Sequence, residues 1–194
     1  ELVEGPTGKP QYPSNWSEIS TMTISYGHGI STSPVHLAGA YSAIVNGGTL
    51  VKPTVLKQTA PHIGERIISQ KVSMQMRSIL RHVVTEGTAS YGEVPGYSVA
   101  GKTGTADKVS VHGGYHKEKV LATFASFFPS NDPKYVLVLT LDEPEDLTQS
   151  EPRRTAGWTA VPVAAEMIRR VAPLLGLAPE IEISPQNGLT LANN

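Results

Sequence analysis

The sequence predicts an α+β fold in which a central antiparallel sheet is flanked by helices. Three strand-like segments, at about 98–108, 120–128 and 135–142, follow one another with only short, turn-rich connections between them. Such connections join antiparallel neighbours, so the three segments predict a meander at the centre of the sheet. Apolar residues recur at helical spacing both before and after these segments, which indicates helices on either side of the meander in the chain.

Residues 1–22 contain several Pro and Gly residues and predict an extended surface segment, because these residues supply turns and remove backbone donors. The first helix is expected at 34–46. Ser33 is its N-cap candidate, since a hydroxyl there accepts an unpaired backbone N–H, and Gly47 and Gly48 follow as a stop signal. Apolar residues cover most of the circumference of this helix, so we expect it to be substantially buried.

The next elements are a hairpin and an amphipathic helix. A short edge strand at 50–56 and a returning segment at 66–69 predict the hairpin. Ser69 then caps a helix at about 70–86, in which the apolar residues keep helical spacing. A last helix at about 159–175 is expected to pack its apolar side on one face of the sheet.

Composition excludes several function classes. The chain has 194 residues, 16 Lys and Arg against 17 Asp and Glu, and only 17% charged residues, so we expect no nucleic-acid partner, which would require a basic excess. The absence of Cys removes disulfides, thiolate zinc sites and Cys nucleophiles. The longest apolar stretches fall well short of the roughly 20 residues that span a bilayer as a helix. The first residue is not Met and no signal peptide follows, which favours an internal fragment or a processed product.

The strand at 98–108 contains the segment AGKTGTA, residues 100–106. Two glycines weaken a strand, so they suggest that a ligand approaches the backbone closely. Alternation places Lys102 and Gly104 on one face and Thr103 and Thr105 on the other, before twist and bulging. An ammonium group with hydroxyls suits a ligand carboxylate, and a backbone N–H beside them can point at an oxyanion. Lys-Thr-Gly is a signature of penicillin-recognising serine enzymes, although an ordinary solvated strand is the simpler alternative.

Several further segments extend this match in a fixed order. They are YGHGISTSPVHLAGAY (26–41), NGG (46–48), KP (52–53), GYSVAGKTGTA (96–106), ASFFP (125–129) and LDEP (141–144). Together they resemble the transpeptidase domain of class B penicillin-binding proteins, and most closely the septal type, penicillin-binding protein 3. The resemblance implies the penicillin-binding protein and serine β-lactamase-like fold. It divides the chain into an extended segment (1–22), the C-terminal half of a transpeptidase domain (22–175) and a surface tail (176–194).

The resemblance implies roles for the residues of the Lys-Thr-Gly-Thr strand. Lys102 would set the electrostatics of the catalytic centre and recognise the substrate carboxylate. The hydroxyls of Thr103 and Thr105 would hydrogen-bond that carboxylate, and the backbone N–H of Thr105 would form half of the oxyanion hole. Gly104 would keep the strand open to the peptide stem. Catalytic roles therefore fall on Lys102 and Thr105, and all four residues would bind substrate.

The loop after this strand offers two more candidates. In the family it borders the substrate groove, so the resemblance implies that Tyr115 and His116 line it; a plain solvated loop is the alternative. His112 and His116 have the spacing of a metal pair, but no third ligand is nearby in the sequence and the loop is rich in Gly, so we expect no metal site.

Four other features have simpler interpretations. His28 lies between two glycines, which predicts a tight turn with an incidental His. The acidic run 142–146 is interpreted as a solvated loop rather than a carboxylate pair of the glycosidase kind. Arg153 and Arg154 are expected on the surface, with a partner or a substrate phosphate as the alternative. Residues 87–89 are expected to play a structural part.

One departure from the family pattern is decisive. No Ser of this chain is followed by Lys three residues later, and no Ser-x-Asn occurs. The acylating Ser, its activating Lys and the second Ser of the family are therefore expected upstream of Glu1. We interpret the chain as one wall of an active site that needs an N-terminal half of the same polypeptide, both for the nucleophile and for folding.

The resemblance implies a serine D-alanyl-D-alanine transpeptidase of peptidoglycan that works through an acyl-enzyme and is acylated by β-lactams. Its partners would be the N-terminal half, the stem peptide, β-lactams and divisome proteins, and it would need no metal or organic cofactor. The resemblance also implies the periplasmic face of the inner membrane, with the anchor outside this chain. The alternatives are a serine β-lactamase or carboxypeptidase, and a non-catalytic module that binds a divisome protein.

Overall fold

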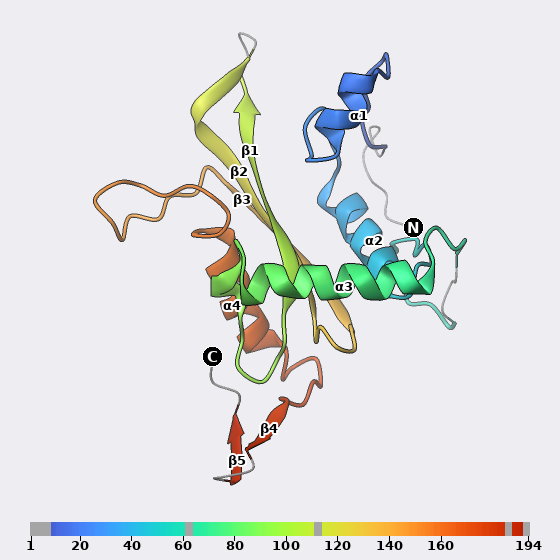
Figure 1. Cartoon of the computed structure of the whole chain (residues 1–194), viewed down its shortest axis with the longest axis vertical. Coiled ribbons are helices and arrows are strands. Elements are labelled where there is room, and N and C mark those ends of the chain that lie inside the picture. Colours follow the sequence, from blue (N-terminus) through green and yellow to red (C-terminus); the bar gives the residue numbers. More distant parts are fainter. Residues whose placement is uncertain (1–8, 61–63, 111–113, 185–187, 192–194) are drawn as a thin grey trace.

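The computed structural model describes residues 9–60, 64–110, 114–184 and 188–191. β1, β2 and β3 form a three-stranded antiparallel sheet in that order, and β4 pairs with β5 in a separate hairpin. Helices precede and follow the sheet, so the predicted α+β class is confirmed (Figure 1). The elements are α1 (Glu18–Ile24), α2 (Pro34–Val45), α3 (Gln70–Thr85), the 3-10 helix η1 (Ser90–Gly92), β1 (Ala100–Val109), β2 (Tyr115–Phe128), β3 (Tyr135–Asp142), α4 (Ala160–Val171), β4 (Ile181–Ser184) and β5 (Gly188–Leu191).

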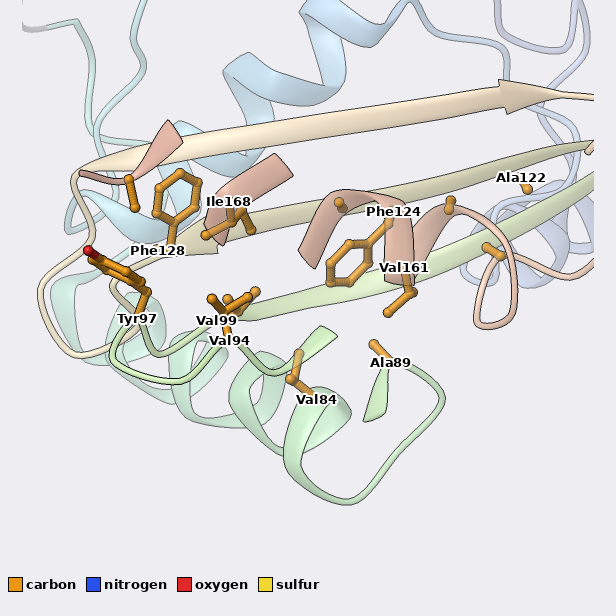
Figure 2. Close-up of a cluster of buried hydrophobic side chains, with 14 residues drawn as sticks. Val84, Ala89, Val94, Tyr97, Val99, Ala122, Phe124, Phe128, Val161 and Ile168 are labelled. Carbon is orange, nitrogen blue, oxygen red and sulfur yellow. The ribbon is translucent and has the colours of Figure 1, made fainter. Parts of the chain in front are cut away.

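The central strand, β2, supplies side chains to two hydrophobic clusters. Phe124 is fully buried in the larger cluster, with Val161 and Ile168 of α4 (Figure 2). Phe127 is fully buried in a smaller cluster that includes Val45 of α2. Because an even and an odd position of one strand point to opposite faces, α4 covers one face of the sheet and α2 the other. Each buried Phe contributes about 2–3 kcal/mol through removal of apolar surface from water.

The helix starts follow the capping residues that the sequence offers. Ser33 and Ser69 each accept a backbone N–H of the first turn, from His36 and from Val72. After α2, Gly47 and Gly48 have φ values of +96° and +103°, so the predicted stop uses the left-handed backbone that glycine favours. The predicted helices at 34–46 and 70–86 are thereby confirmed to within one residue. The first is less buried than expected, since only Ala43 and Val45 of α2 are buried and most of its other apolar side chains are half-buried.

Five details of the sequence prediction are wrong. The strand expected at 120–128 begins at Tyr115, so Tyr115 and His116 lie in β2 and not in a loop. The extended segment 1–22 runs into α1, a short helix that starts with a capping box at Ser17. The edge strand at 50–56 is absent: in the described residues this region forms one isolated bridge, Thr49 to Arg66, since Pro53 removes a donor from any longer ladder. α4 ends at Val171 rather than 175, ahead of Pro173. The tail contains the β4–β5 hairpin rather than an irregular strap.

None of the helices in the described ranges is long and apolar enough to cross a membrane.

Candidate active site

β1 lies at one edge of the three-stranded sheet, with β2 as its neighbour. On its outer edge the carbonyl of Val99 accepts a hydrogen bond from Arg81 Nη1 (2.6 Å), and the carbonyl of Thr103 accepts one from Lys102 Nζ (2.8 Å). In an antiparallel strand, the N–H and C=O of every second residue point to the same edge. The backbone N–H of Thr105, two residues after Thr103, therefore also points away from β2.

The side chains of the Lys-Thr-Gly-Thr segment meet at this edge. The side chains of Lys102 and Thr103 leave the strand on opposite faces. The Lys102 side chain nevertheless curves around the strand, and its Nζ donates to Thr103 Oγ1 (3.3 Å). The hydroxyl of Thr103 also lies 2.8 Å from that of Thr88, just after α3. Thr105 Oγ1 accepts the backbone N–H of Ala156 (3.0 Å). An ammonium group and two hydroxyls are thus held along one strand edge by the loops that precede β1 and α4.

The two glycines of this segment, Gly101 and Gly104, have different surroundings. At Gly101 an added Cβ would overlap the carbonyl oxygen of Ala125 and lie 2.9 Å from the Cα of Ser126, so β2 approaches the backbone too closely for any side chain. At Gly104 an added Cβ would meet nothing within 4 Å. Gly101 is therefore required by strand packing, whereas Gly104 leaves open space on the face of the strand from which Lys102 starts.

A cleft of about 690 Å³ lies beside the end of this segment. Its wall on β1 includes Thr105 and Asp107, and the opposite wall consists of residues 11–13 and 26–31. The ring centroids of His28 and Tyr115 lie 5.9 Å apart, and both residues line the cleft. His28 is in the predicted turn, with φ of +93° and +88° at the flanking glycines.

The two groove candidates, Tyr115 and His116, are the first residues of β2, and only one of them reaches the cleft. Tyr115 lines the cleft, whereas His116 is half-buried and is not among the cleft-lining residues. His112 lies outside the described residues. Within the residues that the structure describes, no three His, Asp or Glu side chains gather in a group that could hold a metal ion.

The acidic run after β3 is neutralised by cations. Lys108 Nζ donates to Asp142 (2.9 Å) and to Glu143 (2.8 Å), and its hydrogen bond, followed by that of Lys119, holds the pKa of Glu143 below its usual range. Glu145 is bound by Arg154 (2.7 Å). A glycosidase acid needs a raised pKa, and the pKa of Glu143 is shifted in the opposite direction.

Arg153 is also occupied within the chain. Its Nε donates to Asp146 (2.9 Å), and its guanidinium lies 3.7 Å from the ring centroid of Trp158. Stacking of this kind fixes the plane of the guanidinium and the path of the loop. With Arg154 on Glu145, both arginines hold the loop that leads into α4.

Known proteins with similar sequences agree on one family. Residues 3–168 match the family described as penicillin binding protein transpeptidase domain. The probable peptidoglycan D,D-transpeptidase FtsI of Caulobacter vibrioides is 34% identical over 205 residues, a match that covers 100% of this chain and 33% of that protein. Stage V sporulation protein D of Bacillus subtilis is 34% identical over 173 residues, covering 83% of this chain and 26% of that protein.

The solved structures lead to the same family. The transpeptidase domain of penicillin-binding protein 3 from Burkholderia pseudomallei superposes with a TM-score of 0.76 at 34% identity, over 87% of this chain and 50% of that chain. The chain thus spans half of a solved transpeptidase domain and a third or less of the two curated relatives. These matches confirm the predicted fold and resemblance: the chain belongs to the penicillin-binding protein transpeptidase domain family.

Proposed function

We propose that this chain forms one wall of the active site of a peptidoglycan D,D-transpeptidase that works through a serine acyl-enzyme. The observation that carries the proposal is the pair of hydrogen bonds from the Lys102 ammonium to the carbonyl and the hydroxyl of Thr103. Strand alternation directs the N–H of Thr105 to the same edge of β1 as that carbonyl. Relatives that bear the name peptidoglycan D,D-transpeptidase support the reaction class.

The nucleophile is proposed to come from a part of the polypeptide outside these 194 residues, because this chain has no Ser-x-x-Lys. Its Ser Oγ attacks the carbonyl carbon of the penultimate D-Ala, and the C–N bond to the terminal D-Ala breaks as that residue leaves with a proton. An acceptor amine then attacks the ester, and the Ser oxygen departs. The N–H of Thr105 stabilises the oxyanion in both steps. Lys102 and the hydroxyls of Thr103 and Thr105 bind the terminal carboxylate.

β-Lactams would follow the same first step. The amide bond of the ring breaks, but the leaving nitrogen stays attached to the acyl group, so the acyl-enzyme persists. A role in cell division is supported by the similarity to penicillin-binding protein 3. Within that role we propose a location on the periplasmic face of the inner membrane, an anchor outside these residues, and divisome proteins as partners.

Labelling of the complete polypeptide with a fluorescent penicillin, followed by a denaturing gel and peptide mass mapping, tests the proposal. We expect covalent label on a Ser outside these 194 residues, blocked by prior incubation with unlabelled penicillin and stable for hours. Label on a Ser of this chain would contradict our account of the nucleophile. Rapid loss of the label would favour a β-lactamase or carboxypeptidase, and a complete lack of label would favour the non-catalytic module.

Thr105→Val offers a second test. The substitution removes the acceptor of the Ala156 N–H and one hydroxyl at the strand edge. Loss of one part-buried hydrogen bond is expected to lower the free energy of unfolding by about 1 kcal/mol. The acylation rate is expected to fall about tenfold, since one donor to the carboxylate is lost. Thr105→Ser keeps the hydroxyl and should restore most of the rate; a Ser variant as slow as the Val variant would exclude the hydroxyl as the cause.

A further inference from the structure

We propose that Arg81 is a positioning residue for acylation: from α3, it holds the outer edge of β1 so that the Thr105 N–H lies where the oxyanion forms. The inference rests on the proposed transpeptidase function, and it adds a residue outside the Lys-Thr-Gly-Thr segment. It starts from the hydrogen bond between Arg81 Nη1 and the carbonyl of Val99 (2.6 Å).

The position of this bond on the strand is informative. The backbone N–H and C=O of every second residue point to the outer edge, and these residues include Val99, Thr103 and Thr105. Arg81 therefore binds the same edge that presents the proposed oxyanion donor. Lys102 also binds this edge, but its partner is the adjacent Thr103, so that bond moves with the strand. Arg81 belongs to another element and connects the edge to α3.

Arg81 is itself held in a fixed orientation. Its Nη1 and Nη2 donate to both carboxylate oxygens of Glu93, with a distance of 2.9 Å for Nη2 to Oε1. The side chains of Arg81 and Glu93 are only 28% and 23% exposed. A planar guanidinium bound to a carboxylate by two bonds loses most of its rotational freedom. The Arg81 guanidinium therefore ties three parts of the chain together: α3, the segment after η1, and the carbonyl of Val99, one residue before β1.

The position of the strand edge matters for the reaction because an oxyanion donor works only within a narrow range. Such donors lie about 2.7–3.1 Å from the oxyanion, and a misplacement of about 1 Å can lower a rate by about 100-fold. Among the residues that the structure describes, β1 has a hydrogen-bonded strand on one side only, so its outer edge relies on contacts from other elements. Thr88 and Ala156 bind the side-chain hydroxyls of Thr103 and Thr105. Arg81 instead binds a backbone carbonyl, that of Val99.

Arg77 provides a matched control one turn earlier on the same helix. It donates to the carbonyls of Ser130 and Asn131, with a distance of 3.1 Å to Ser130. These residues are in the turn between β2 and β3, and not on β1. The Ser130 N–H also donates to the carbonyl of Ser98 (2.8 Å), which lies just before β1 and has the parity that faces β2. Arg77→Met therefore removes the same kind of bond from the same helix but leaves the outward carbonyl of Val99 bound to Arg81.

The test measures the acylation of the complete polypeptide by a fluorescent penicillin, with the rate constant at saturation (k2) and the half-saturating concentration (K) determined separately. For Arg81→Met we expect k2 to fall at least tenfold with K within about threefold, at a temperature well below unfolding. Arg81→Lys keeps a donor for Val99 and should recover part of k2. Arg77→Met should keep k2 within about twofold.

Hydrogen exchange of a peptide covering 98–106 gives a readout that needs no activity. It should exchange faster in Arg81→Met than in Arg77→Met. If Arg81→Met does not fold, k2 is compared between the wild type and the variants Arg81→Lys and Glu93→Gln. A k2 within twofold of the wild type in both variants overturns the inference. If the wild type is labelled, two further results overturn the inference. One is that Arg81→Met has the same k2 as the wild type, and the other is that Arg77→Met lowers k2 as much as Arg81→Met does. An unlabelled wild type overturns the proposed function, and this inference with it.

Discussion

Replacement of Lys102 by methionine is expected to lower the rate of acylation by a fluorescent penicillin at least 100-fold in the complete polypeptide. Methionine keeps the length and the apolar stem but removes the ammonium that donates to the Thr103 carbonyl and hydroxyl. Removal of one charged or oxyanion-binding donor from an active site costs roughly 100- to 1,000-fold in rate. The thermal midpoint should change little, because the side chain of Lys102 is exposed.

The matched control for this variant is Lys108→Met on the same strand. Lys108 forms ion pairs with Asp142 and Glu143, so the control removes the same charge six residues away and leaves the Lys-Thr-Gly-Thr edge intact. Its acylation rate should stay within about threefold of the wild type. Equal losses in the two variants would show that net charge, rather than the position of Lys102, controls the reaction. A wild-type rate in Lys102→Met would remove Lys102 from the proposed site.

Gly101→Ala should have the largest effect on stability. Its Cβ would overlap the Ala125 carbonyl oxygen and crowd the backbone of Ser126, and backbone atoms of a paired strand cannot rotate away. We expect the free energy of unfolding to fall by about 3 kcal/mol, at the upper end of what overpacking costs. Urea unfolding of the transpeptidase domain, followed by circular dichroism, measures the change.

Gly104→Ala is the control for this second substitution, since an added Cβ meets no atom within 4 Å there. Its free energy of unfolding should stay within about 0.5 kcal/mol of the wild type, while its acylation rate reports whether substrate occupies the open space. Similar losses of stability in both glycine variants would contradict the close approach of β2 at Gly101.

Local patterns in the sequence were sufficient for most of the sheet and for two helices. The strands were predictable because alternation and turn residues are local signals, and α2 and α3 because Ser33 and Ser69 cap them. α1 was missed because the Pro and Gly residues of 5–13 do not set the conformation as far as 22, since 14–26 contain neither and include the capping box at Ser17. The strand at 50–56 was over-predicted, because its apolar alternation has no ladder to join beyond one bridge.

The candidate site was predictable only in part. The Lys-Thr-Gly-Thr residues stand together in the sequence, and the structure places them on one open edge. Other contacts join distant segments: His28 meets Tyr115 across the cleft, and Thr88 meets Thr103. The bond from Arg81 to Val99 likewise depends on the packing of α3 beside β1. Nothing in the local pattern around His28, Thr88 or Arg81 indicates these partners, because tertiary packing alone creates them.

The open edge of β1 has a consequence for solubility. An exposed strand edge is a template on which a second chain can add its own strand, and proteins often block such edges with charged side chains. Here Arg81 and Lys102 each place a cation on an outward carbonyl of β1. The same two cations that serve the proposed chemistry thus discourage edge-to-edge aggregation, and a variant that lacks both should self-associate more readily than either single variant.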